Sequence, residues 1–280
     1  MVFWSKMHLI TLLPTMIIMI GVSILISYLL RNKSKKIKII PLQVLSAIAI
    51  GLEIAKQIIG IVDGYDTYWL PFHFSSIFLF SSVVVCFFTY NKTNWFARFS
   101  NSYFSTYLTM MFVFMAVYPE IIYSGETITN FSANFLNAHT IIYHNIVLFA
   151  FFLMIGLNFY EKKTKFGLMS AVLGSFCYGI VGGTMATVLK TNYNSFYFCQ
   201  VAPIEQIRQS LVNSLGLGGQ IIYVMMILAA TIFFSIVCYG VFRLVVWLKE
   251  LIFKQKNPPI SQVEVFDNQT LSTSDQTDQK

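Results

Sequence analysis

The fold of this chain is decided by long apolar stretches, the first of which, residues 7–30, reads MHLITLLPTMIIMIGVSILISYLL. A helix needs about 20 such residues to cross the hydrocarbon core of a bilayer. Seven runs reach that length, so the sequence predicts an all-α fold, a polytopic transmembrane bundle of seven helices. The expected spans cover residues 7–30, 39–62, 70–90, 99–118, 137–160, 166–189 and 220–248.

The composition is that of a membrane protein. Of the 280 residues, 56% are hydrophobic and only 11% are charged, whereas about a quarter of the residues in soluble domains are charged. The net charge of +7 is typical of loops beside an anionic membrane leaflet, and no soluble stretch interleaves basic with aromatic residues. We therefore expect membrane lipids as partners and no nucleic acid.

The charges between the apolar runs alternate along the chain. Basic clusters follow the first, third, fifth and seventh runs, whereas acidic residues such as Asp66, Glu120 and Glu126 occupy the connections after the second and fourth. Basic connections stay in the cytoplasm by the positive-inside rule. Seven spans then predict an N-terminus outside the cell and a C-terminus in the cytoplasm.

The sequence predicts two regions, a seven-span transmembrane domain at residues 1–250 and a disordered cytoplasmic tail at residues 251–280. The tail is rich in Ser, Thr, Gln and Asp and has too little apolar content to bury a core. The first run is too long for a signal peptide and should remain as a span. Frequent Lys, Ile, Phe and Asn indicate an AT-rich bacterial genome, which predicts a bacterial plasma-membrane protein. The four cysteines suggest neither a disulfide nor a metal site, and no cofactor is expected.

Small and hydroxylated side chains recur at helical spacing in two of the runs. In the sixth run, small residues at every fourth position predict close packing against a neighbouring helix. They are Gly167, Ala171, Ser175, Gly179 and Gly183. In the fourth run, one face carries hydroxyl groups that we expect to form hydrogen bonds between helices, namely Ser102, Ser105, Thr106 and Thr109.

The connection between the sixth and seventh runs is too long for a plain turn. After Pro203 it places Ile204, Ile207, Leu211 and Leu215 on one helical face, with Glu205, Arg208 and Gln209 opposite. This pattern predicts a short interfacial helix on the outer surface. Such a helix is either a lid over a site or an amphipathic connector.

Two ionisable residues in the second run, Glu53 and Lys56, are costly to place inside a bilayer. They lie one helical turn apart. Glu53 shares one face with Gln43, Ser46, Gln57 and Gly60, and we expect that face to point into the bundle. One interpretation is a structural ion pair in which Lys56 reaches toward the headgroups. The other gives Glu53 a role in a functional site.

Histidines of two further runs are expected to meet Glu53 in the outer half of the bundle. His73 lies where the third run begins, after Pro71 in the first helical turn. The fifth run also enters from outside, and its first turns carry Asn137, His139, Tyr143, His144 and Asn145. Histidine titrates near neutral pH, so this convergence with a carboxylate fits acid–base chemistry as well as hydrogen bonding between helices.

Several short motifs occur in an order that resembles the YwaF-type family of bacterial integral membrane proteins. They are Glu53-Ile54-Ala55-Lys56-Gln57, Leu70-Pro71-Phe72-His73, Tyr143-His144-Asn145 and Asn192-Tyr193. The resemblance extends to about residue 242, and the family is similar in turn to eukaryotic membrane acyltransferases that remodel phospholipids with a cysteine and a histidine. It therefore implies lipid acyl transfer or hydrolysis.

Carried over to this chain, the resemblance implies a catalytic role for His73 and a second functional histidine at His144. Where bacterial members carry cysteine this chain has Ser75, and the eukaryotic cysteine falls near Phe72. The corresponding arrangement has a serine nucleophile, either Ser75 or Ser76. His73 is its base, and Glu53 orients a histidine. The expected substrate-binding residues are Lys56, Gln57, Asn145, Asn192 and Tyr193.

A transporter or a receptor-like binding protein is the alternative. In that case the same residues would contact a small solute or a proton. No internal repeat is visible in the sequence, which weakens the case for an inverted-repeat transporter. A structural partner without chemistry is the third class that the sequence leaves open.

Overall fold

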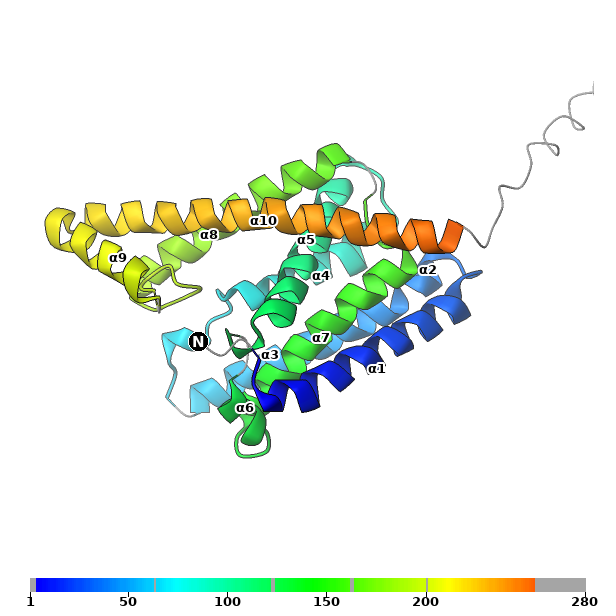
Figure 1. Ribbon diagram of the computed structural model, residues 1–280, viewed down its shortest axis with the longest axis horizontal. Helices are drawn as coiled ribbons and strands as arrows, with labels where there is room; N and C mark the ends of the chain where they lie inside the picture. The colour runs from blue at the N-terminus through cyan, green and yellow to red at the C-terminus, as the bar shows by residue number, and fades with distance from the viewer. Residues whose placement is uncertain (1–3, 63, 122–123, 162–163, 200, 255–280) are drawn as a thin grey trace, which may run out of the picture. The chain divides into compact units, whose positions relative to one another are not determined.

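The computed structural model describes residues 4–62, 64–121, 124–161, 164–199 and 201–254, and these residues form helices and connections without a strand. Figure 1 shows the arrangement of the helices. The elements are α1 Lys6–Leu30, α2 Lys35–Lys38, α3 Ile40–Val62, η1 Thr67–Trp69, η2 Phe74–Ser76, α4 Ile77–Val83, η3 Val84–Thr89, α5 Trp95–Val117, η4 Pro119–Ile121, α6 Gly125–Thr129, α7 Phe135–Leu157, α8 Thr164–Leu189, α9 Ala202–Leu215 and α10 Leu217–Lys254.

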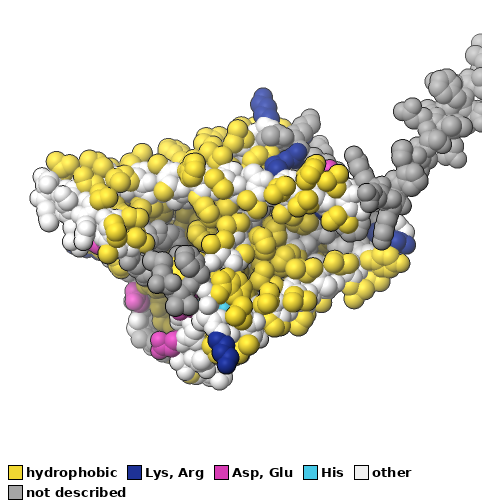
Figure 2. All heavy atoms as spheres, viewed as in Figure 1, with side chains coloured by type: hydrophobic (Ala, Val, Ile, Leu, Met, Phe, Trp, Pro, Cys, Tyr) yellow, Lys and Arg dark blue, Asp and Glu magenta, His cyan; other side chains and the backbone are white. Residues whose placement is uncertain are grey.

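Five of the described helical stretches are long and apolar enough to cross a membrane. They are Lys6–Leu30, Lys35–Val62, Phe135–Leu157, Lys165–Leu189 and Leu217–Ile252. Each coincides with a predicted span. Hydrophobic side chains also dominate the face drawn in Figure 2, where a soluble protein would present charged groups.

The third predicted span forms a shorter apolar helix, Phe74–Thr89. The prediction that Pro71 lies in its first turn is wrong, because the backbone is extended at His73 and the helix begins at Phe74. The Tyr178 hydroxyl donates to the Phe72 carbonyl across 3.1 Å, which helps to keep this segment out of the helix. The last turn, η3, is a π turn, and the side-chain amide of Gln43 donates to the Cys86 carbonyl within it (2.9 Å).

The fourth predicted span, α5, lies at the centre of the helices. It packs against α4, α7 and α8, and its side chains are buried around much of its circumference. The hydroxyl groups of Ser105, Thr106 and Thr109 donate to carbonyls one turn earlier in α5 itself. The prediction that these three hydroxyls bond between helices is therefore wrong. Because protein covers it, α5 does not need the uniform apolar surface of a lipid-facing helix.

The polar face of α3 points into the bundle, as the sequence predicts. Ser46 bonds the Ser82 hydroxyl (2.8 Å), and the amide of Gln57 donates to the Trp69 carbonyl (2.8 Å). Gly60 lies directly against the Trp69 ring. These contacts all join α3 to the segment between residues 69 and 86, so that segment is fixed along the whole length of α3.

The small residues of α8 face α10, which confirms the predicted close packing. Gly167 lies against Tyr239, Gly179 against Leu228, and Gly183 against Val224. The Ser175 hydroxyl meets the Ser235 hydroxyl in the same interface. The absence of a side chain at the glycines lets the two helices approach closely.

The described chain divides into two compact units, residues 1–242 and residues 243–280. The second unit contains the end of α10, which runs to Lys254. Residues 255–280, most of the expected disordered tail, lie outside the described residues. The disordered tail therefore stays a prediction, and the site discussed below belongs entirely to the first unit.

Replacing Gly167 with alanine is expected to destabilise the protein by about 1–3 kcal/mol, because the added methyl group overlaps the rigid Tyr239 ring. The matched control is Gly240→Ala in α10, where nothing lies within 4 Å of an added methyl. Thermal unfolding of the detergent-solubilised protein measures both. Equal melting temperatures for the two variants would contradict the close α8–α10 packing.

Candidate functional site

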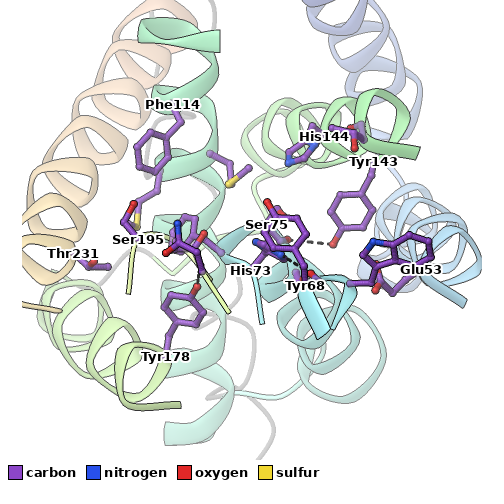
Figure 3. Close-up of a pocket in the computed structure, with 18 of the residues that line it drawn as sticks. Glu53, Tyr68, His73, Ser75, Phe114, Tyr143, His144, Tyr178, Ser195 and Thr231 are labelled. Carbon is purple, nitrogen blue, oxygen red and sulfur yellow. Dashed lines mark hydrogen bonds between the residues drawn. The ribbon is translucent and has the colours of Figure 1, made fainter. Parts of the chain in front are cut away.

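A cavity of about 730 Å³ lies between α3, α5, α7, α8, α10 and two connecting segments. Its wall combines ionisable and hydroxyl groups with apolar side chains from α5 and α10 (Figure 3). The polar part includes Glu53, Lys56, His73, Ser75, His139, His144 and Asn192. The apolar part includes Met110, Met111, Phe114, Ile227 and Phe234. The cavity therefore offers both surfaces that an amphiphilic ligand requires.

Glu53 is the centre of a charged cluster in this wall. The Lys56 ammonium lies 2.6 Å from its Oε1, and the Gln57 amide donates to the same oxygen (2.7 Å). The His139 Nε2 lies 3.7 Å from the other carboxylate oxygen. The Lys56 side chain is only 12% exposed, so its amine pairs with Glu53 inside the bundle instead of reaching toward the headgroups.

His73 is held by contacts from both connecting segments. Its Nε2 lies 2.8 Å from the Tyr68 carbonyl oxygen, and because a carbonyl only accepts, this nitrogen carries the proton. The Nδ1 of a neutral ring is then the basic nitrogen. Tyr68 and Tyr193 pack edge to face against the imidazole at centroid distances of 4.4 and 5.2 Å. The ring is thus fixed in orientation and in tautomer.

The backbone at Ser75 is anchored by two tyrosines. The hydroxyl groups of Tyr107 and Tyr143 both donate to the Ser75 carbonyl, across 2.7 and 3.2 Å. Figure 3 shows Tyr143 reaching toward the segment that carries Ser75. Tyr107 and Tyr143 are buried, so these bonds form away from water, where hydrogen bonds are strongest.

His144 lies one residue after Tyr143 in α7 and lines the same cavity. Its Nδ1 contacts the Thr140 carbonyl oxygen at 2.7 Å, which places the proton on Nδ1 of the neutral ring. Nε2 is then the basic nitrogen of His144. His73 and His144 therefore present opposite ring nitrogens as bases, each set by a backbone carbonyl.

The structure brings together most, though not all, of the residues singled out in the sequence. Glu53, Lys56, His73, Ser75, His144 and Asn192 line the cavity. Gln57 instead joins Glu53 to the Trp69 carbonyl, and Tyr193 is fully buried against His73. Asn145 lines a different cavity. Their functional roles stay predictions.

Three contributors were given no catalytic or substrate-binding role from the sequence, namely His139 and Tyr143, which were only placed in the first turns of the fifth run, and Tyr178. His139 precedes Tyr143 by one helical turn and stacks on it at 5.5 Å, so the spacing of the two residues was an available signal. Tyr178 lies in α8, and its contact with Phe72 joins residues far apart in the chain. No pattern in a single sequence indicates such a contact.

One rim of the cavity is tied to α9. The Arg208 guanidinium pairs with Glu205 at 2.5 Å, and Glu205 accepts a hydrogen bond from the Cys199 backbone N–H (2.9 Å). Gln220 continues the network by donating to the Phe196 carbonyl (3.0 Å). The connection that carries Asn192 to the cavity is therefore held at its far end by an ion pair. Glu205 and Arg208 face the protein, whereas Ile204, Ile207 and Leu215 stay exposed.

Hydrogen bonds from Arg208 lower the pKa of the Glu205 carboxyl from 4.5 to about 2. A carboxyl with a lowered pKa stabilises the folded state above its unfolded pKa and loses that contribution as the pH falls toward the folded one. The difference in melting temperature between wild type and Glu205→Gln is therefore expected to be constant from pH 8 to pH 5 and to shrink below pH 4.5. Thermal unfolding across this range tests it, and a difference that vanishes between pH 8 and pH 6 would contradict the ion pair.

In the part of the chain that the structure describes, no group of three His, Cys, Asp or Glu side chains could hold a metal ion. The apolar helices and the cavity that lies between them define an α-helical membrane protein. The model of the TMEM164 family matches residues 3–239, and the chain belongs to this family. Searches of the curated proteins and of the solved structures find no match.

Proposed function

We propose that this TMEM164-family protein transfers or hydrolyses acyl groups of membrane lipids in the 730 Å³ cavity. One observation carries the proposal: a carboxylate of α3, a serine and a histidine of the segment before α4, and two histidines of α7 line a single cavity that also has an apolar wall. A lipid ester has the same two parts, a polar ester and a hydrocarbon chain. The resemblance to the YwaF-type family and to membrane acyltransferases agrees with this function.

The proposed membrane topology has seven spans, with the N-terminus outside and the C-terminus in the cytoplasm of a bacterial plasma membrane. Two helices join the five apolar ones as spans. At about 1.5 Å per residue the stretch Phe74–Thr89 is roughly 24 Å long and α5 roughly 35 Å. The central position of α5 among spanning helices supports its inclusion, and the charges of the connections support the orientation.

This topology predicts opposite labelling of two connections. With the native cysteines replaced, a cysteine at Lys36 should be protected from a membrane-impermeant maleimide in intact cells, whereas one at Glu126 should react. Both positions are exposed in the structure. Permeabilised cells should label both, which controls for reactivity. Labelling of both positions in intact cells would overturn the topology.

In the proposed reaction Ser75 attacks the carbonyl carbon of an acyl ester while Nδ1 of His73 takes the hydroxyl proton. The ester C–O bond breaks, the leaving alcohol takes the proton from His73, and the acyl group stays on Ser75. A lipid hydroxyl or water then attacks the acyl-serine, His73 accepts its proton, and Ser75 recovers it as the acyl group leaves. The two anchoring tyrosines fix the Ser75 backbone during both steps.

The charged cluster and His144 support this chemistry. Lys56 compensates the charge of Glu53, so the cavity wall holds a carboxylate without a net charge in the membrane. His139, and not His73, is the histidine beside Glu53, and we assign the orienting role of Glu53 to that pair. His144 lines the same cavity as Ser75 and His73 and is the second histidine of the proposed site.

Purified full-length protein is expected to release or transfer a labelled acyl group from a phospholipid. Ser75→Ala should lower the rate at least about 100-fold, because an activated nucleophile and its base each contribute factors of this size. The His73→Ala, His144→Ala double variant should show a similar loss. The matched control is Ser81→Ala, since the Ser81 hydroxyl bonds a carbonyl of its own helix (2.7 Å). Equal rates for all four proteins would remove the proposal.

A second candidate is a proton-coupled transporter or a receptor-like binding protein for a small solute. The Glu53–Lys56 pair beside His139 favours it, because ionisable groups inside a membrane frequently form proton or solute pathways. Saturable uptake into proteoliposomes that disappears in Glu53→Gln and survives in Ser75→Ala would support transport over acyl chemistry.

A further inference from the structure

A second cavity of about 260 Å³ lies between α1, α7, α6 and the turn that follows α6. It shares no residue with the first cavity. Within α7, Tyr143 and His144 face the first cavity, whereas Ile141 and Asn145 face the second. The two sites therefore lie on different sides of the same helix.

Asn145 leaves one acceptor unused in this wall. Its Nδ2 donates to the Ile141 carbonyl across 2.9 Å, which fixes the orientation of the amide. Its Oδ1 is buried and has no hydrogen-bond partner among the described residues. A buried amide oxygen without a partner is unfavourable, and it gains from any ligand that brings an N–H or O–H donor.

The other polar atoms of the cavity are also acceptors. The Thr11 hydroxyl donates to the Met7 carbonyl (2.6 Å), and the Thr15 hydroxyl donates to the Thr11 carbonyl (2.7 Å). Each of these hydroxyl groups has a single proton, so its oxygen can only accept further bonds. The ligand that fits this cavity is therefore a hydrogen-bond donor.

The remaining wall excludes both a charged group and water as the main occupant. Leu12, Ile128, Phe131 and Ile141 are apolar, and no lining residue is charged. Water occupies about 30 Å³ per molecule in the liquid, so a cavity of 260 Å³ would hold many waters against a mostly apolar surface. A hydrocarbon chain fills such a space more favourably.

The surroundings indicate where the ligand comes from. Neighbouring α1 residues Leu9, Ile10 and Leu13 are exposed apolar side chains, so lipid lies beside the cavity. Asn145 is ten residues into α7, which at about 1.5 Å per residue places it roughly 15 Å along a span, near the middle of a hydrocarbon core about 30 Å thick. A charged headgroup is too costly at that depth, but an uncharged hydroxyl is not.

We propose that the second cavity binds an uncharged lipid with one free hydroxyl, of the diacylglycerol class. Its hydroxyl donates to Oδ1 of Asn145, and part of one acyl chain lies against Leu12 and Ile141. This site needs only the membrane location of α1 and α7. It does not depend on acyl chemistry in the first cavity.

The test compares two lipids that differ in one proton, dioleoylglycerol and its 3-O-methyl ether. Purified full-length protein in detergent is incubated with each lipid, and retained lipid is measured by native mass spectrometry. The wild type is expected to bind the free alcohol about tenfold more tightly, the effect of one hydrogen bond to a buried acceptor. Equal binding of the two lipids by the wild type would overturn the proposal. Retention of neither lipid would overturn it as well, because water would then be the occupant.

Two variants locate the site. Asn145→Leu is expected to bind both lipids equally, and a tenfold preference that persists in it would also overturn the proposal. Ile141→Trp should fill the cavity and weaken the binding of both lipids. Ser75→Ala is the matched control in the first cavity and should keep the full preference, so loss of acyl turnover and loss of diacylglycerol binding are separate results.

Discussion

The structure depends on one constraint: polar groups inside hydrocarbon must find their partners within the protein. The polar face of α3 is where this constraint acts most strongly. Its hydroxyl, amide and carboxylate groups are satisfied by a second hydroxyl, two backbone carbonyls and a lysine. The second hydroxyl and the two carbonyls belong to residues 69–86, so these bonds fix the segment that carries His73 and Ser75. The position of the candidate site is thus a consequence of how α3 satisfies its own polar residues.

Much of the helical architecture could be predicted from the sequence, because hydrocarbon-length apolar runs have few alternatives. The five most apolar stretches were identified, and the glycine ladder of α8 correctly indicated a close helix neighbour. The beginning of the helix after Pro71 was placed too early. The Phe72 carbonyl there bonds Tyr178, a residue of another helix, and no local pattern contains this information.

Part of the candidate site could also be predicted from the composition of the apolar runs. Glu53, His73 and His144 stand out because ionisable residues are rare in apolar runs, and all three line the cavity. Asn145 was assigned to the same site from its neighbour His144, but consecutive residues of a helix point about 100° apart. It therefore faces the second cavity. The hydroxyls of α5 show the same limit, since a serine can bond its own helix as readily as another.

The π turn at Val84–Thr89 sets how this helix responds to changes in its length. A π turn holds one residue more than an α turn, so losing one residue there could be absorbed by conversion to ordinary α geometry. Between Phe74 and Val83 no π turn supplies an extra residue, so a deletion there cannot be absorbed in this way. It would turn the beginning of the helix by about 100° relative to its end and carry Ser75 away from the cavity. Single-residue deletions should consequently be tolerated at the end of the helix that holds the π turn and selected against at the end that carries Ser75.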